Sequence, residues 1–88
     1  MKAIITVLGR DRVGIIAEVC TFLSKREINI LDISQTIVQG FFNMLMIVEM
    51  QPGADFAQCA KELQALGETM GLEAKLQRED IFEAMHRI

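Results

Sequence analysis

The charged residues best suited to chemistry gather in one short segment, "GRDRVG" at positions 9–14. It holds Arg10 and Arg12 with Asp11 between them, and a glycine stands at each end. Glycine and charge ahead of a helix often mark a place where the backbone holds a small anionic group. The segment is therefore a candidate for a catalytic loop, for a ligand-binding loop, or only for the start of a helix.

A catalytic role would need partners that the rest of the chain supplies poorly. An acylphosphatase-type hydrolase requires an arginine to hold phosphate and an asparagine to position water. The candidates are Arg10 or Arg12 and Asn29 or Asn43. The negative charge of Asp11 would repel a phosphate at this place. No serine, cysteine and histidine arrangement indicates a nucleophile with its base. We therefore expect no enzyme and no catalytic residue, and an acylphosphatase-type hydrolase is the alternative.

Metal and cofactor chemistry has equally weak support. Cys20 and Cys59 fall on the apolar sides of the expected helices, and neither belongs to a Cys-x-x-Cys motif. His86 stands alone near the end of the chain, and one histidine with two dispersed cysteines is a poor basis for a metal site. We expect reduced core cysteines, no metal site and no cofactor.

Composition limits the class of partner. The 88 residues predict a single domain, 1–88, whose formal net charge of −3 argues against a nucleic-acid ligand. No apolar run approaches the roughly 20 residues that span a bilayer, and the N-terminus lacks a cleavable signal pattern. We therefore expect a cytoplasmic protein without membrane contact. Hydrophobic residues make up 51% of the chain, so either the core is dense or some apolar surface meets a partner.

The hydrophobic pattern predicts two helices and four short strands. In chain order these are strand Lys2–Leu8, helix Arg12–Arg26, strand Ile28–Gln39, strand Phe42–Met50, a helix between Asp55 and Gly71, and strand Leu72–Gln77. The first and third strands are apolar on both faces, as central strands are, whereas the second and fourth alternate with polar residues, as edge strands do. The order predicts an α+β, ferredoxin-like βαββαβ fold with antiparallel sheet order 4-1-3-2 and both helices on one face.

Local signals place the ends of the two helices. Asp11 is the expected N-cap of the first helix, whose apolar stripe is expected at Ile16, Val19, Cys20 and Leu23. Asp55 is the expected N-cap of the second helix, with Gln58 completing a capping box and Gly71 following the last turn. A short helical tail over residues 79–88 is expected to dock on its own sheet or on a partner.

The segment "DRVGIIAEVCTFLSKREINILDISQ", residues 11–35, resembles the opening of an ACT domain. Such domains show an Asp-Arg-Pro-Gly or similar loop, then an apolar helix, then Asn-Ile at the start of the second strand. Val13 stands where many of them have proline, and Gly14 is kept. The resemblance continues at low resolution along the whole chain. Its tail is similar to that of small stand-alone ACT proteins of largely unassigned function.

The resemblance implies a regulatory domain that forms a homodimer, often edge to edge, and binds an amino acid or other small molecule between the two chains. The ligand-binding positions that it implies are Asp11, Arg12, Val13, Gly14, Asn29 and Ile30. The residue types support part of this, because Gly14 lets backbone approach a ligand and Asn29 offers both a donor and an acceptor. Two alternatives stay open: Asp11 acts as a helix cap, or the domain is a protein-interaction module without a ligand.

Overall fold

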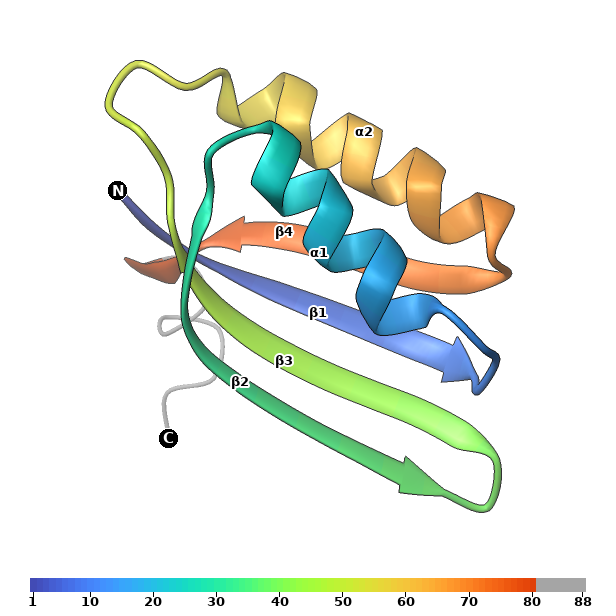
Figure 1. The fold of residues 1–88 in the computed structure, drawn as a ribbon. Coiled ribbons are helices and arrows are strands. Elements are labelled where there is room, and N and C mark those ends of the chain that lie inside the picture. The colour runs from blue at the N-terminus through green and yellow to red at the C-terminus, as the bar shows by residue number, and fades with distance from the viewer. Residues whose placement is uncertain (81–88) are drawn as a thin grey trace.

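The computed structural model of the chain describes residues 1–80, in which four strands and two helices follow in the order β1-α1-β2-β3-α2-β4. Their bounds are β1 Lys2–Arg10, α1 Ile15–Lys25, β2 Asn29–Val38, β3 Phe41–Glu49, α2 Phe56–Thr69 and β4 Leu72–Arg78. The strands form one antiparallel sheet in the order β2-β3-β1-β4, and both helices lie on the same face of it (Figure 1). This confirms the predicted ferredoxin-like fold, since 4-1-3-2 is the same order counted from the other edge.

The core fills the space between the helices and the two central strands. Strand β1 lies between β3 and β4, and β3 lies between β1 and β2, as their apolar faces predicted. Alternate side chains of these strands are almost fully buried under the helices: Ala3, Ile5, Val7, Phe42, Met44, Met46 and Val48. The core therefore lies on the helix side of the sheet, and the outer edges of the sheet stay open.

Helix α1 starts later than the sequence suggested. Its N-cap is Gly14, in the left-handed region with φ 92°, and no side chain caps it. The prediction that Asp11 caps this helix is wrong, because Asp11 lies three residues earlier and its own N–H donates to the carbonyl oxygen of Gly40 at 2.8 Å. The buried stripe is also shifted, since Ile15 and Phe22 join Val19 and Leu23 in it, while Ile16 is exposed and Cys20 half-buried.

Helix α2 begins and ends where the sequence placed it. The carboxylate of Asp55 accepts the backbone N–H of Gln58 at 3.0 Å, which confirms the predicted cap. Gly71 follows the last turn with φ 70°, also as predicted. The capping box is incomplete, because the side chain of Gln58 donates to Glu62 at 3.3 Å instead. Toward its end the helix lies close to β4, since a Cβ on Gly67 would stand 2.8 Å from that of Ala74 and 3.1 Å from the carbonyl oxygen of Leu72.

Strand β2 is the long open edge of the sheet. It pairs with β3 on one side only, and nine of its ten residues are exposed. A β-bulge at Leu31 breaks the strict alternation, so Ile30 and Ile33 lie opposite Val48 and Met46, two core residues of β3. Strict alternation had placed Leu31 on the face of Ile33. The bulge thus decides which apolar residues of the edge face the helices.

Three further observations concern residues 1–80 alone. No helix in this part of the chain is long and apolar enough to cross a membrane. The same residues contain no group of three or more His, Cys, Asp or Glu side chains that could hold a metal ion. Both cysteines are free thiols. The predicted helical tail falls for the most part on residues 81–88, together with His86, and these lie outside the described residues.

Candidate functional site

The loop between β1 and α1 forms a hollow against the far end of β2, which we call the loop hollow. Its volume is about 290 Å³, and its lining residues are Asp11, Arg12, Gly14, Ile15, Ile16, Ala17, Gln35, Ile37 and Phe42. The hydrogen bond from Asp11 to Gly40 ties the loop to the turn between β2 and β3. That turn is tight, because Gln39 and Gly40 both have positive φ, as in a two-residue hairpin. The guanidinium carbon of Arg10 lies 5.2 Å from the centre of the Phe41 ring, so this arginine covers the hairpin rather than the loop hollow.

The polar end of the loop hollow offers both signs of charge and free backbone donors. Within residues 1–80 the side chains of Asp11 and Arg12 form no hydrogen bond or ion pair. Because no side chain caps α1 at Gly14, the N–H groups of its first residues have no partner within the helix. A carboxylate, a guanidinium and several N–H donors side by side fit the ammonium and carboxylate groups of a zwitterion.

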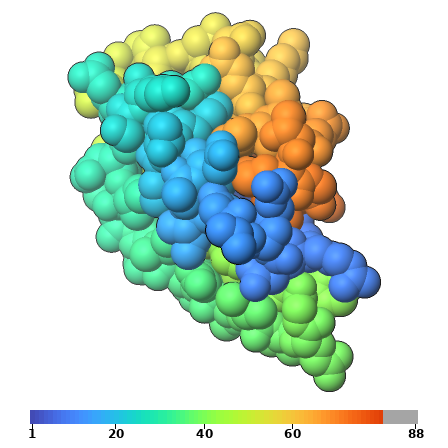
Figure 2. Space-filling view, turned by 45° about the vertical axis from the view of Figure 1, so that its right-hand side comes forward, coloured from blue at the N-terminus to red at the C-terminus, as the bar shows by residue number. Residues whose placement is uncertain are grey.

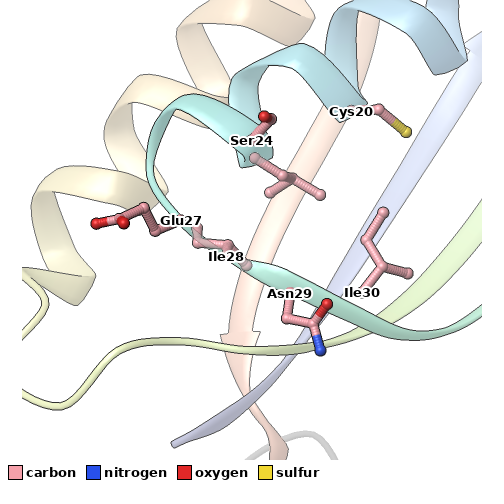
Figure 3. A pocket seen from close by; sticks show the side chains of 7 residues that line it. Cys20, Ser24, Glu27, Ile28, Asn29 and Ile30 are labelled. Carbon is pink, nitrogen blue, oxygen red and sulfur yellow. The ribbon is translucent and has the colours of Figure 1, made fainter.

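Asn29 and Ile30 line a second hollow at the other end of α1, shown in Figure 3, which we call the strand-start hollow. Its volume is about 420 Å³, and its lining residues are Cys20, Leu23, Ser24, Glu27, Ile28, Asn29 and Ile30. The helix supplies Cys20 and Ser24, and β2 supplies its first two residues, Asn29 and Ile30. Figure 3 shows the Ile30 side chain pointing toward α1 and the Asn29 amide pointing away from it. Asn29 is exposed, and within the described chain its side chain makes no hydrogen bond.

The structure thus divides the six predicted site residues between two places. Asp11, Arg12 and Gly14 line the loop hollow, while Val13 stands beside it, 95% exposed, without lining it. Asn29 and Ile30 lie at the opposite end of α1, whose eleven residues span about 16 Å. The two parts of the predicted site therefore do not face each other within one chain.

Sequence reasoning missed six residues that line the loop hollow. Three of them, Ile15, Ile16 and Ala17, are the first residues of α1. Gln35 and Ile37 come from the helix-side face of β2, and Phe42 lies directly opposite Ile37 on β3. The available signal was the alternation of Ile33, Gln35 and Ile37, which places these side chains on one face of the strand. What the alternation could not show is that the hairpin brings this face against the start of α1.

The residues considered for a hydrolase do not share one hollow. Arg10 lies on the same sheet face as Asn43, but its guanidinium packs on the Phe41 ring. Arg12 lines the loop hollow and Asn29 the strand-start hollow. Asn43 pairs with Leu8 and Thr36 and alternates with the core residue Phe42, so it lies on the sheet face away from the helices. The geometry therefore gives no support to the arginine–asparagine arrangement of an acylphosphatase-type enzyme.

The shifted pKa values at the helix side belong to a cluster outside both hollows. Hydrogen bonds from the side chains of Gln58 and Arg26 lower the pKa of Glu62. The Arg26 guanidinium lies 3.6 Å from the centre of the Phe22 ring on α1 and 3.0 Å from the Glu62 carboxylate on α2, so it links the two helices. Burial raises the pKa of the Cys59 thiol beside it. These groups hold the two helices together.

The fold and the loop hollow define a small α+β domain of ferredoxin-like topology, with a polar loop after its first strand. A sequence profile of the ACT domain matches residues 2–77. The chain belongs to the ACT domain family, whose members are commonly small-molecule regulatory domains.

Relatives and solved structures agree with this assignment. A UPF0237 protein of Bifidobacterium longum is 54% identical over 88 residues, which cover 99% of this chain and 98% of the relative. The ACT domain protein from Streptococcus pneumoniae superposes with a TM-score of 0.85 at 41% identity, covering 98% of each chain. A putative glycine cleavage system transcriptional repressor superposes with a TM-score of 0.77 at 26% identity, over 86% of this chain and 44% of that one.

Proposed function

We propose that the protein is a cytoplasmic, homodimeric sensor that binds an amino acid between its two chains. The observation that carries the proposal is the separation of two complementary half-sites along one open strand. The loop hollow holds the charged and N–H groups, and Asn29 lies at the opposite end of β2. Figure 2 shows α1 lying alongside β2, whose two ends carry the two half-sites. A two-fold axis across β2 reverses the second strand, so the start of each β2, with Ile30 on the helix side and Asn29 beside it, comes next to the loop hollow of the other chain.

The two edges of the sheet differ in how well they suit a second copy. Strand β2 has ten residues with a single charge, Asp32, and it exposes Leu31, Ile33 and Ile37. Strand β4 has seven residues, and an ion pair of 2.9 Å joins its exposed Glu73 and Lys75. Charged, short edge strands resist pairing with another chain, whereas long apolar edges favour it. The difference supports β2 as the edge that pairs.

The position of the axis follows from the two half-sites. Counted along β3, Asn29 lies three positions from Ile33 because of the bulge, and Ile37 lies four. An axis at Ile33 therefore brings the start of one β2 close to the loop hollow of the other chain. Asp32 then lies opposite Ser34 of the second copy and not opposite its own counterpart. Like charges directly opposite each other destabilise a strand pair, and this register avoids them. At the axis the two Ile33 side chains pack together.

The proposal is tested by combining a binding screen with a change at the proposed axis. Calorimetric titration of the free amino acids is expected to find a ligand, and Asn29→Ala is expected to weaken it, because a donor and an acceptor are lost. Ile33→Lys places two like charges at the axis, so sedimentation is expected to show a monomer that no longer binds. Ile33 is 43% exposed in the single chain, so this variant should still fold, which circular dichroism checks.

A matched control adds the same charge elsewhere. Gln64 lies on the exposed surface of α2 beside β4. The variant Gln64→Lys should therefore leave both the pairing of the chains and ligand binding unchanged. Ligand binding by a monomeric Ile33→Lys variant would contradict the shared site. A dimer that binds no amino acid would favour a protein-interaction module without a ligand.

The regulatory part of the proposal draws on the family and on one neighbour. ACT domains are commonly regulatory, and the neighbour named as a putative transcriptional repressor carries a regulatory role in its name. For this chain we propose that the bound amino acid changes how the two chains present their surface to another protein.

A further inference from the structure

We infer that the ligand is an amino acid with an uncharged, apolar side chain. This inference rests on the proposed function and adds to it the class of side chain. Three properties of the loop hollow support it: the balance of its charges, the nature of its walls and its size.

The two charged side chains of the loop hollow match the two charges of a zwitterion, so no further charge remains to pair with a ligand side chain. Among the described residues that line it, only Asp11 and Arg12 are charged. The ammonium group of an amino acid would use Asp11, and its carboxylate would use Arg12 and the N–H groups at the start of α1. A charged side chain would then have no opposite charge in the hollow. Removing such a charge from water without a partner is costly.

The walls beyond the charged loop are mostly apolar. Ile16 and Ile37 flank the hollow and are 38% and 51% exposed, although both are large apolar residues. Ile15 and Phe42 are almost fully buried beneath them and form the floor. Gln35 is the only uncharged polar side chain among the described lining residues. An aliphatic group placed here would remove the exposed surface of Ile16 and Ile37 from water, which is favourable in proportion to the area covered.

The size of the loop hollow fits a ligand as small as an amino acid. Its volume of about 290 Å³ is just below the roughly 300–1,000 Å³ of sites for drug-sized ligands. In the proposed dimer the second copy adds the neutral Asn29 and the apolar Ile30. Glu27 is the charged residue among the described lining of the strand-start hollow, and in Figure 3 its carboxylate points away from Asn29. The second copy therefore does not change the preference of the loop hollow for an uncharged, apolar ligand side chain.

A titration panel tests the inference on the wild-type protein. Calorimetry would compare isoleucine, leucine, valine and methionine with serine, aspartate and lysine. We expect the best aliphatic amino acid to bind at least about tenfold tighter than serine, because contacts of one or two methylene groups in an apolar pocket have effects of this size. Tightest binding of serine, aspartate or lysine would overturn the inference and leave the proposed sensor intact. A panel without any binder would overturn the proposed function itself.

A pair of matched variants tests whether the apolar wall sets the preference. Ile37→Thr keeps a β-branched residue on the strand but puts a hydroxyl into the loop hollow, whereas Val38→Thr makes a similar change at the next residue, which does not line the hollow. Both changes lie on the pairing edge, so the readout is the ratio of the affinities for the aliphatic ligand and for serine. We expect this ratio to fall several-fold, up to about tenfold, in Ile37→Thr and to stay at the wild-type value in Val38→Thr. Equal ratios in the two variants would overturn the inference.

Discussion

Replacing Asp11 by alanine is expected to leave the stability of the fold almost unchanged, while Asp55→Ala lowers it. The Asp55 carboxylate accepts the N–H of Gln58 at 3.0 Å at the start of α2, and losing such a cap costs about 1 kcal/mol, within a range of about 0.5–2 kcal/mol. Asp11 makes no corresponding bond, because α1 begins at Gly14 without a side-chain cap. Its side chain is exposed, so its replacement should change the free energy of unfolding by less than about 0.5 kcal/mol.

Urea unfolding followed by circular dichroism measures this difference. All proteins must be compared at one concentration, because pairing of chains shifts the apparent stability by mass action. A loss of 1 kcal/mol corresponds to a decrease of about 0.3–1 M in the urea midpoint for a small domain, so the two variants should separate clearly. Equal losses in Asp11→Ala and Asp55→Ala would refute the conclusion that Asp11 is free of α1. Unchanged stability together with weaker binding of an amino acid is the result that the proposed site requires.

Three further changes test the packing and titration of the helices. Gly67→Ala is expected to lower the free energy of unfolding measured in urea. Overpacking against Ala74 costs about 1–3 kcal/mol, whereas the higher helix preference of alanine recovers only about 1 kcal/mol. A net gain in stability would contradict the close approach of α2 to β4. Hydrogen bonds from Gln58 and Arg26 lower the pKa of Glu62. The contribution of this carboxylate to the free energy of unfolding is therefore complete above its pKa in the unfolded chain, and it is lost as the pH falls through its pKa in the folded protein. Urea unfolding at a series of acid pH values should show that the free energy of unfolding falls less steeply in Glu62→Gln than in the wild-type protein. An identical fall in both proteins would show that Glu62 does not contribute to the acid sensitivity. Because burial raises the pKa of the Cys59 thiol, iodoacetamide should label it only as the protein unfolds; rapid labelling of the native protein, followed by mass spectrometry, would speak against its burial.

The parts of the fold that could be predicted from the sequence are those set by residues a few positions apart. Strands β1 and β3 are apolar on both faces, and that pattern alone identified them as the central strands. The cap of α2 needs only Asp55 and an N–H three residues later, and its end needs only the glycine that follows. Together with the order of the elements, these local signals were enough to define the sheet.

The parts that could not be predicted depend on contacts between distant segments. Helix α1 starts at Ile15 because the loop before it is bonded to the hairpin at Gly40, twenty-nine positions beyond Asp11. An aspartate close to a helix start looks the same in the sequence whether it caps the helix or not. Likewise the bulge at Leu31 arises from the pairing of β2 with β3, and no pattern within β2 marks it. Both features decide how the candidate site is built, so its geometry required the structure.

In the proposed arrangement, binding of the ligand and pairing of the chains are one linked equilibrium. A ligand that contacts both chains raises their affinity for each other by the same factor by which pairing raises the affinity for the ligand. Such coupling can report on ligand concentration only if the unliganded pair is weak enough to respond. The open edge has features that limit its strength: the bulge at Leu31 interrupts the regular strand, and Asp32 adds a charge beside it. A perfectly regular apolar edge would hold the dimer together without the ligand. In the proposed arrangement, the irregular start of β2 would therefore allow an amino acid at the two half-sites to control the association of the chains.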